Sequence, residues 1–474
     1  MIGLVSRAPR SNKRVNFLMG FLILILLLGF LTRPWSGTGK VVRAAPGPGE
    51  TRLTLYFTFH TPNAFYLFPV NTSIPDTKTP AAAAMELLIQ GPPPGGPLWS
   101  GIPRDTRLLG VEIKDGTAYV NFSREITRAN VGSSGEALLV QSIVATLGQF
   151  PTVKRVKILV EGQPVETLAG HVDLTGYLTP QFDKVYRGFP DTRGHWSEGE
   201  VLAFSLRGVL SGYPDGTFAP EEKTTRAEFI KMVLAGLDLL KPGSEGKPVG
   251  TPTFTDVGES SWFFPYIERA VSLGIVRPQD YGPAFAPEEK LTRREMAVLV
   301  VRAMGLEGEA ARKRGADLPF ADTVNLPDWA KGYLAAAAER KYLRGYEDGT
   351  FRPNGQATRA EATAVLGRLL NLGQGAMYLA QPQRDQRLTG QVLIMGAASV
   401  FEASVCFRLK SKTGRLLQED CLMASEGAPG WGVFGGLFNL APVEEKEGMV
   451  EAFYYSPKDG QERNVISIPV RFGQ

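Results

Sequence analysis

The tetrapeptides Thr225-Arg226-Ala227-Glu228, Thr292-Arg293-Arg294-Glu295 and Thr358-Arg359-Ala360-Glu361 follow one another at intervals of 67 and 66 residues. A Thr followed three residues later by Glu is a capping box, in which the Thr hydroxyl accepts from the Glu amide and the Glu side chain accepts from the Thr amide. We therefore predict that a helix begins at each Arg. Three copies of this signal at a constant interval indicate three copies of one structural unit.

Other elements recur at intervals of 65 to 67 residues and complete the unit. They are Phe189-Pro190-Asp191, Phe254-Thr255-Asp256 and Phe320-Ala321-Asp322; Trp196, Trp262 and Trp329; and, in the first and third units, the loops Gly212–Phe218 and Gly345–Phe351. The pattern predicts a helix, a turn-rich loop and a second helix in each unit, over residues 187–241, 252–306 and 318–372. Phe218 and Phe351 are predicted to fold back into the core. The second unit departs from the pattern, because its loop reads Arg277-Pro278-Gln279-Asp280-Tyr281-Gly282.

The repeated Arg is unusual at the start of a helix. A cation in the first turn opposes the helix macrodipole, so Arg226, Arg293 and Arg359 are poorly placed for stability alone. A bound carboxylate would reverse this, because it would meet free amides and a guanidinium, while a Trp could stack on a sugar ring. The alternative is that Trp and Phe are core residues and that each Arg pairs with the Asp of the Phe-x-Asp element.

These units resemble S-layer homology (SLH) domains. The resemblance implies an all-α bundle of three repeats whose grooves bind secondary cell wall polysaccharide, typically through a pyruvylated sugar that carries the carboxylate. The irregular loop of the second unit leaves open whether its groove functions. By motif position, the implied glycan-binding residues are Asp191, Trp196, Gly212, Arg226, Asp256, Trp262, Arg293, Asp322, Trp329, Gly345 and Arg359.

Residues 51–180 alternate between strand and helix patterns and predict an α/β domain. We expect strands at 53–57, 117–122 and 154–160, and helices at 81–89 and 136–150. Several blocks occur in an order that resembles the sporulation and spore-germination (GerMN) domain, and none of them contains catalytic chemistry. The blocks are Leu87–Pro92, Ile102-Pro103, Asp115–Phe122, Glu161–Val165 and Gly170–Leu174.

Residues 385–474 show no helical period and predict an all-β domain. A turn at Lys412–Arg415 would place Cys406 opposite Cys421 and Arg408 opposite Glu419. Counting outward from that turn puts the cysteines at a hydrogen-bonded position, where a cross-strand disulfide fits less well, so the pattern leaves a disulfide open. The blocks Gly396–Ala403, Gly427–Phe434, Ser456–Gly460 and Val465–Val470 resemble the immunoglobulin-like domain of spore germination proteins, which implies a β-sandwich.

The N-terminus carries an export signal. Four basic residues precede the uncharged apolar run Phe17–Leu31, which is near the minimum length of a membrane span. A small-residue site, Val42-Arg43-Ala44, lies 13 residues past the run. This distance favours an uncleaved anchor within residues 1–32 over a cleaved signal peptide, with a Pro/Gly-rich linker at 33–50. The basic flank then predicts that the rest of the chain lies outside the cytoplasm, in the cell envelope.

Composition excludes several function classes. The chain has 474 residues, a net charge of +4 and 43% hydrophobic residues, which is typical of several globular domains and argues against nucleic acid as a partner. Two cysteines exclude a disulfide scaffold, and His60, His171 and His195 are too scattered to predict a metal site. No nucleotide-binding, zinc-hydrolase or serine-hydrolase motif occurs, so we expect neither a cofactor nor catalysis.

The sequence therefore predicts a non-catalytic cell-envelope protein that attaches to secondary cell wall polysaccharide through its repeats. Its expected partners are that glycan, the membrane, and envelope or germination proteins that bind the two terminal domains. The main alternative is a structural component of the sporulation or germination machinery in which the repeats act as a protein scaffold. A wall-remodelling enzyme with an unrecognised site is a third possibility.

Overall fold

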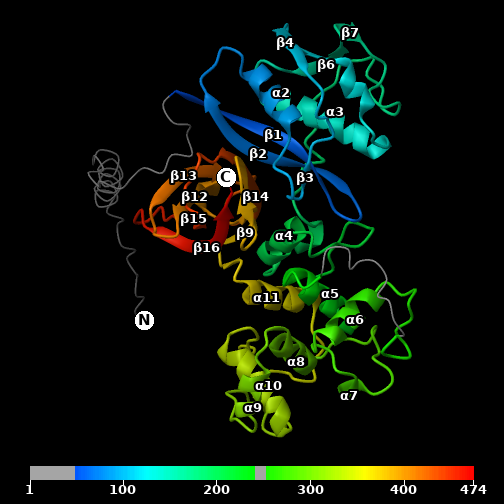
Figure 1. Ribbon diagram of the computed structural model, residues 1–474, viewed down its shortest axis with the longest axis vertical. Coiled ribbons are helices and arrows are strands. Elements are labelled where there is room, and N and C mark those ends of the chain that lie inside the picture. Colours follow the sequence, from blue (N-terminus) through cyan, green and yellow to red (C-terminus); the bar gives the residue numbers. More distant parts are fainter. Residues whose placement is uncertain (1–48, 241–251, 474) are drawn as a thin grey trace, which may run out of the picture. The chain divides into compact units, whose positions relative to one another are not determined.

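The computed structural model of the protein describes residues 49–240 and 252–473 (Figure 1). The predicted anchor at 1–32 and almost all of the linker at 33–50 lie outside the described residues. Within the described part of the chain, no helix is both long enough and apolar enough to cross a membrane.

The N-terminal region is the predicted α/β domain. Strands β4, β5, β6 and β7 form one sheet in that order, and helix α3 is the crossover between the parallel strands β5 and β6. Helices α2 and α3 pack against β1 of the long hairpin β1–β2. The elements are β1 (Glu50–His60), β2 (Phe65–Pro75), α2 (Pro80–Gln90), β3 (Leu98–Trp99), β4 (Leu108–Lys114), β5 (Thr117–Phe122), η1 (Arg124–Arg128), α3 (Ser133–Leu147), β6 (Arg155–Val160) and β7 (Gln163–Pro164).

A buried carboxylate organises one loop of this domain. Glu136, in the first turn of α3, is fully buried. Its Oε1 accepts from Thr167 Oγ1 at 2.7 Å and from the amides of Leu168 and Ala169 at 2.9 and 2.8 Å, and its Oε2 accepts from the His171 amide at 2.7 Å. Burial raises the pKa of Glu136, but these hydrogen bonds outweigh burial and the net pKa is lowered. His171 thus contributes its backbone to the fold.

We predict that Glu136→Gln lowers the free energy of unfolding by about 2–3 kcal/mol, because the amide nitrogen would face backbone donors. Since the folded-state pKa lies below the ordinary 4.5, the carboxylate's contribution is present above that value and is lost as pH falls through the folded-state pKa. Urea unfolding between pH 7 and pH 3 measures both effects. The exposed Glu166→Gln is the control, and equal stability losses in the two variants would contradict the assigned role.

The middle region is helical, and its three capping boxes are confirmed. Thr225, Thr292 and Thr358 accept from the amides of Glu228, Glu295 and Glu361, and helices begin at the three predicted arginines. The elements are η2 (Pro190–Thr192), α4 (Glu198–Leu206), α5 (Arg226–Gly236), α6 (Phe264–Ser272), α7 (Pro278–Tyr281), α8 (Arg293–Ala303), α9 (Glu307–Arg312), α10 (Asp328–Glu339) and α11 (Arg359–Leu370).

The predicted aromatic anchors fill the core of the repeats. Phe218 and Phe351 are fully buried, as is Phe285 at the equivalent position of the second unit. Their rings lie 5.2 to 5.5 Å from those of Phe189, Phe254 and Phe320, the residues of the Phe-x-Asp elements. Each unit therefore holds its loop by one aromatic pair.

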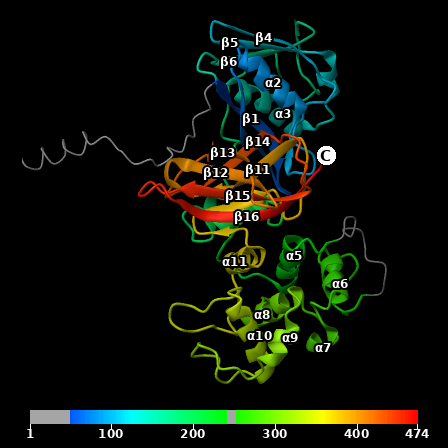
Figure 2. The same ribbon diagram turned by 60° about the vertical axis from the view of Figure 1, so that its left-hand side comes forward.

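The C-terminal region is all-β (Figure 2). One sheet has the order β10-β16-β15-β12-β13, and β14, β11, β9 and β8 form the facing layer. Between the two layers, the ring centroids of Phe407 and Phe438 lie 4.0 Å apart. The elements are β8 (Gly373–Gln374), β9 (Met377–Gln381), β10 (Arg387–Leu388), β11 (Gln391–Ala398), η3 (Phe401–Ala403), β12 (Ser404–Ser411), β13 (Leu416–Met423), β14 (Gly432–Asn439), β15 (Glu447–Tyr455) and β16 (Glu462–Phe472).

Strand β14 also pairs with β2 of the N-terminal domain, in parallel, where Gly436 is opposite Asn71. Asn71 Nδ2 donates to Met423 O and Gly435 O, both at 3.3 Å, and Thr72 Oγ1 donates to Leu437 O at 3.1 Å. The resulting sheet has the order β3-β1-β2-β14-β11-β9-β8. It connects segments more than 350 residues apart in the sequence, a link that the sequence patterns did not predict.

The predicted pairing of β12 with β13 is confirmed, since Cys406 is opposite Cys421 and Arg408 is opposite Glu419. The cysteines form a disulfide with a Cα–Cα distance of 4.0 Å. This spacing is that of a non-hydrogen-bonded pair, so the predicted hydrogen-bonded position is wrong. The reason is a bulge after Leu409, which shifts the register between the turn and the cysteines.

Candidate functional site

The helix-start arginines of the repeats reach across to the neighbouring unit. The guanidinium of Arg226, in the first unit, donates to Glu295 Oε1 through Nε and Nη2 at 2.9 and 2.6 Å. Its Nη1 donates to Phe285 O at 3.0 Å and to Glu289 Oε2 at 2.7 Å. Arg226 therefore joins the capping box and the aromatic anchor of the second unit.

The other two arginines repeat this arrangement and close it into a ring. Arg293 of the second unit bonds to the third unit, and Arg359 of the third unit bonds back to the first. The bonds run from Arg293 Nε to Phe351 O (2.8 Å) and Nη2 to Arg344 O (2.7 Å), and from Arg359 Nε to Phe218 O (2.9 Å) and Nη2 to Ser211 O (3.2 Å). We call these three residues the arginine ring.

Backbone bonds follow the same order around the ring. The first helical amide of each unit donates to a carbonyl of the next unit: Arg226 N to Glu289 O (3.0 Å), Arg293 N to Gly355 O (2.9 Å) and Arg359 N to Glu222 O (2.8 Å). The second helical amide of each unit also donates to a carbonyl of the next unit. The third helical amide, that of the capping-box Glu, donates to the hydroxyl of the capping Thr in its own unit. The expectation that a carboxylate would meet free amides here is therefore wrong, because partners distant in sequence already occupy them.

The aspartates of the Phe-x-Asp elements hold the loops. Asp191, Asp256 and Asp322 each accept from two consecutive backbone amides, at 2.6 to 3.1 Å. The second amide of each pair belongs to a residue with left-handed backbone, Ala219, Ala286 or Arg352, with φ between 52° and 58°. The alternative in which each ring arginine pairs with this Asp is wrong, since the ring arginines approach the capping-box glutamates instead.

The two predicted loop glycines allow a close approach. A Cβ on Gly212 would lie 2.4 Å from the Phe189 ring and 2.5 Å from Thr217 O, so no side chain fits. Gly345 is equivalent, with the Phe320 ring at 2.3 Å. Both glycines are explained by packing of the loop on the aromatic pair.

Tyrosines of the loops, which the sequence analysis did not assign to the site, cover the arginine ring. The guanidinium carbons of Arg359, Arg293 and Arg226 lie 4.9, 4.6 and 5.5 Å from the ring centroids of Tyr213, Tyr346 and Tyr281. Burial, followed by nearby carboxylates, raises the pKa of each tyrosine to about 12, so all three remain neutral. The shared Gly-Tyr-x-Asp-Gly motif was the signal for two of them.

The irregular second unit retains this arrangement. Its short helix α7 places Tyr281 beside Arg226, and the Tyr281 ring also packs 4.7 Å from Phe285. This unit has one residue more between Trp262 and Arg293 than the other units have between the equivalent residues, and it retains the tyrosine contact. The departure in sequence therefore does not remove the ring contact from this unit.

The three tryptophans are the exposed aromatics of the site. Trp196, Trp262 and Trp329 are 57%, 49% and 45% exposed, so the alternative that they are core residues is wrong. Each lies against a neighbouring side chain: His195 beside Trp196, Lys231 over Trp262, and Tyr333 beside Trp329. Within residues 49–240 and 252–473, no cation–π contact or hydrogen bond joins them to the arginine ring. Within the same ranges, no cluster of His, Cys, Asp or Glu could hold a metal ion.

Comparison with protein families identifies three kinds of domain. Residues 54–166 match the Germane model, described as sporulation and spore germination. Residues 188–230, 253–297 and 319–363 match the S-layer homology domain, and residues 378–461 match the immunoglobulin-like domain of bacterial spore germination, Gmad2. The chain therefore contains a GerMN domain, three SLH repeats and an immunoglobulin-like germination domain, and these matched domains are non-catalytic.

Curated relatives include surface proteins and enzymes. A cellulosome-anchoring protein from Acetivibrio thermocellus is 30% identical over 35% of this chain and 36% of its own length. A surface-layer 125 kDa protein from Lysinibacillus sphaericus is 31% identical over 34% of this chain and 13% of its own length. Exoglucanase XynX from Acetivibrio thermocellus is 30% identical over 38% of this chain and 16% of its own length. The chain thus spans 36% of the cellulosome-anchoring protein and only 13% and 16% of the other two, and the matches to enzymes cover their SLH regions.

Among solved structures, the tandem GerMN domains of the sporulation protein GerM from Bacillus subtilis are 24% identical, with a TM-score of 0.26 over 31% of this chain and 51% of that chain. The first GerMN domain of the same protein is 27% identical, with a TM-score of 0.22 over 29% and 98%.

We predict that Arg359→Ala lowers the free energy of unfolding by about 2–4 kcal/mol, because the carbonyls of Phe218 and Ser211 lose a charged donor. Arg340→Ala is the matched control. Arg340 forms a surface pair with Glu309, whose loss costs below about 1 kcal/mol. Urea unfolding measures both variants, and a loss for Arg359→Ala no larger than the control's would contradict the ring.

Proposed function

We propose that this protein is a non-catalytic cell-envelope protein that attaches to secondary cell wall polysaccharide, of the pyruvylated kind, through its three SLH repeats. The SLH matches and the surface-layer and cellulosome-anchoring relatives support attachment to cell wall polymers at the cell surface. The observation that carries the proposal is one half-exposed Trp at the equivalent position of each repeat.

Each residue class has a distinct role in this proposal. The tryptophans provide flat apolar faces for sugar rings, and their exposure leaves them available to a polymer. The aspartates and glycines shape the loops, and the arginine ring sets the spacing of the repeats. Arg293 and Arg359 are 5% and 8% exposed, so they offer a ligand little surface beyond the bonds they already make. The Trp residues are therefore the most direct test of glycan contact.

The terminal domains complete the proposal. The GerMN and immunoglobulin-like domains would present surfaces to envelope or germination proteins, and the N-terminal segment would connect the chain to the membrane. In the second candidate function, the protein would be a structural component of the sporulation or germination machinery with the repeats as a scaffold, and the matches to two germination-type domains support this candidate. Expression confined to sporulation would favour that candidate.

The test is retention of the full chain on purified wall sacculi. We predict that Trp196→Ala, Trp262→Ala and Trp329→Ala combined lower retention by about fivefold or more, because each removes a stacking surface. Removal of pyruvate from the wall by mild acid tests the pyruvylated kind of glycan separately, and we expect it to lower retention of the wild type. Phe401→Ala is the control, since Phe401 is 57% exposed in the immunoglobulin-like domain.

Full retention of the triple variant on untreated wall would refute glycan attachment through the repeats. Because the three side chains are exposed, we expect the variant to fold, and an unchanged circular dichroism spectrum and unfolding midpoint would verify this. Retention that depends on wall protein and not on glycan would support the scaffold function.

A further inference from the structure

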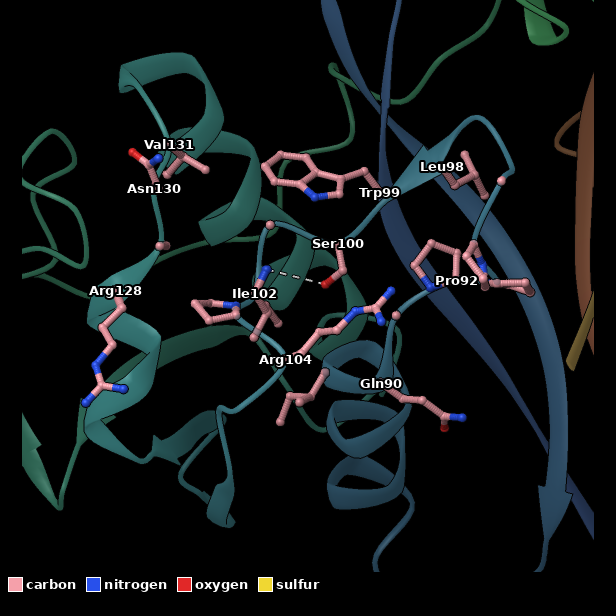
Figure 3. A pocket seen from close by; sticks show the side chains of 18 residues that line it. Gln90, Pro92, Leu98, Trp99, Ser100, Ile102, Arg104, Arg128, Asn130 and Val131 are labelled. Atoms are coloured by element: carbon pink, nitrogen blue, oxygen red, sulfur yellow. Dashed lines mark hydrogen bonds between the residues drawn. The ribbon is translucent and has the colours of Figure 1, made fainter. Parts of the chain in front are cut away.

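A cleft of about 490 Å³ lies in the GerMN domain, and none of its lining residues belongs to the SLH repeats (Figure 3). Its walls come from the loop that follows α2, the segment around β3, and the end of η1. This volume is within the range of small-molecule sites in proteins. The lining residues are Ile89–Gly95, Leu98–Arg104 and Arg128–Val131.

The cleft combines an aromatic face with positive charge. Of the apolar lining residues, Trp99 is 44% exposed, whereas Leu98 and Ile102 are buried. Two of the lining residues are arginines, Arg104 and Arg128, and none is Asp or Glu. An anion would therefore enter without meeting a carboxylate of the lining.

The two arginines differ in their partners. Arg128 lies 3.2 Å from Asp105 and 3.9 Å from Glu125, so its charge is already balanced. Arg104 is exposed, and within the described ranges its guanidinium makes no hydrogen bond or ion pair with the protein. Figure 3 shows its side chain extending toward Pro92, with Arg128 at the opposite side of the cleft. Arg104 is thus the cation that remains available to a ligand.

The walls are held in place without a ligand. The backbone of one wall is restricted by three consecutive prolines, Pro92, Pro93 and Pro94. The adjoining Gly91 and Gly95 have φ of 78° and 82°, a left-handed backbone that glycine adopts readily. On the other wall, Ser100 Oγ donates to Leu88 O at 3.1 Å and accepts from the Ile102 amide at 3.4 Å. A rigid cleft loses little conformational entropy when it binds.

We propose that this cleft binds a short saccharide that carries a carboxylate. The indole of Trp99 would stack on the apolar face of one sugar ring, and the guanidinium of Arg104 would bind the carboxylate bidentately. The amide side chains of Gln90 and Asn130, both in the lining, would bond sugar hydroxyl or acetamido groups. This site is separate from the proposed glycan attachment through the repeats.

The test is isothermal titration of the full chain in mild detergent. The probe is the disaccharide of N-acetylglucosamine and N-acetylmuramic acid, which has a lactyl carboxylate, and its neutral counterpart is chitobiose. We expect the acidic disaccharide to bind at least about tenfold more tightly than chitobiose. Trp99→Ala and Arg104→Gln should each weaken the acidic disaccharide by about tenfold, whereas Arg107→Gln, an exposed arginine outside the lining, should leave it unchanged.

Three results would overturn the inference. They are equal affinity for the two disaccharides, unchanged binding in Trp99→Ala or Arg104→Gln, and tight binding of an acidic proline-rich peptide in place of the disaccharide. The triple Trp variant of the SLH repeats separates this site from the repeats. It should bind the disaccharide normally, and loss of binding there would assign the saccharide to the repeats instead.

Discussion

The donation of each helix-start guanidinium to backbone carbonyls of the next repeat is the constraint on which the helical region depends. Each guanidinium donates to the backbone carbonyl of the buried Phe in a neighbouring repeat, and the bond from the third repeat returns to the first. A cation at a helix N-terminus is unfavourable by a few tenths of a kcal/mol, but several charge-assisted bonds outweigh that cost. The ring therefore turns three short helical units, each too small to bury a core alone, into one body with a continuous core.

Each class of repeated residue has its own structural role in this arrangement. Asp191, Asp256 and Asp322 hold left-handed loop residues, the paired aromatics fill the core, and the tyrosines cover the guanidinium groups. Because none of these tasks needs the tryptophans, their exposed faces remain free to contact a polymer. The terminal domains add a shared sheet through β2 and β14 and a rigid cleft beside Trp99. In our account, one chain thus presents two chemically distinct surfaces that suit glycans.

Sequence patterns predicted those parts of the structure that depend on interactions between residues close together in the chain. The capping boxes, the helix starts, the buried Phe218 and Phe351 and the pairing of Cys406 with Cys421 all depend on residues close together in sequence. The bonds of the arginines could not be read in this way, because their carbonyl partners lie 51 to 148 residues away. The same holds for the pairing of Asn71 with Gly436. The bulge in the hairpin is local, but no residue pattern in the turn distinguished it from a regular two-residue turn. The cleft was missed because its chemistry is carried by single residues brought together by the fold.

Hydrogen exchange at the first helical amide of each repeat tests the central claim most directly. In an isolated helix the amides of Arg226, Arg293 and Arg359 would have no intrahelical partner and would exchange rapidly. In the ring each donates to a carbonyl of another repeat. The account predicts that all three are protected to the level of the helical core and that Arg359→Ala lowers the protection of all three together. Rapid exchange of these amides in the native protein, or loss of protection at only the altered repeat, would contradict a closed ring.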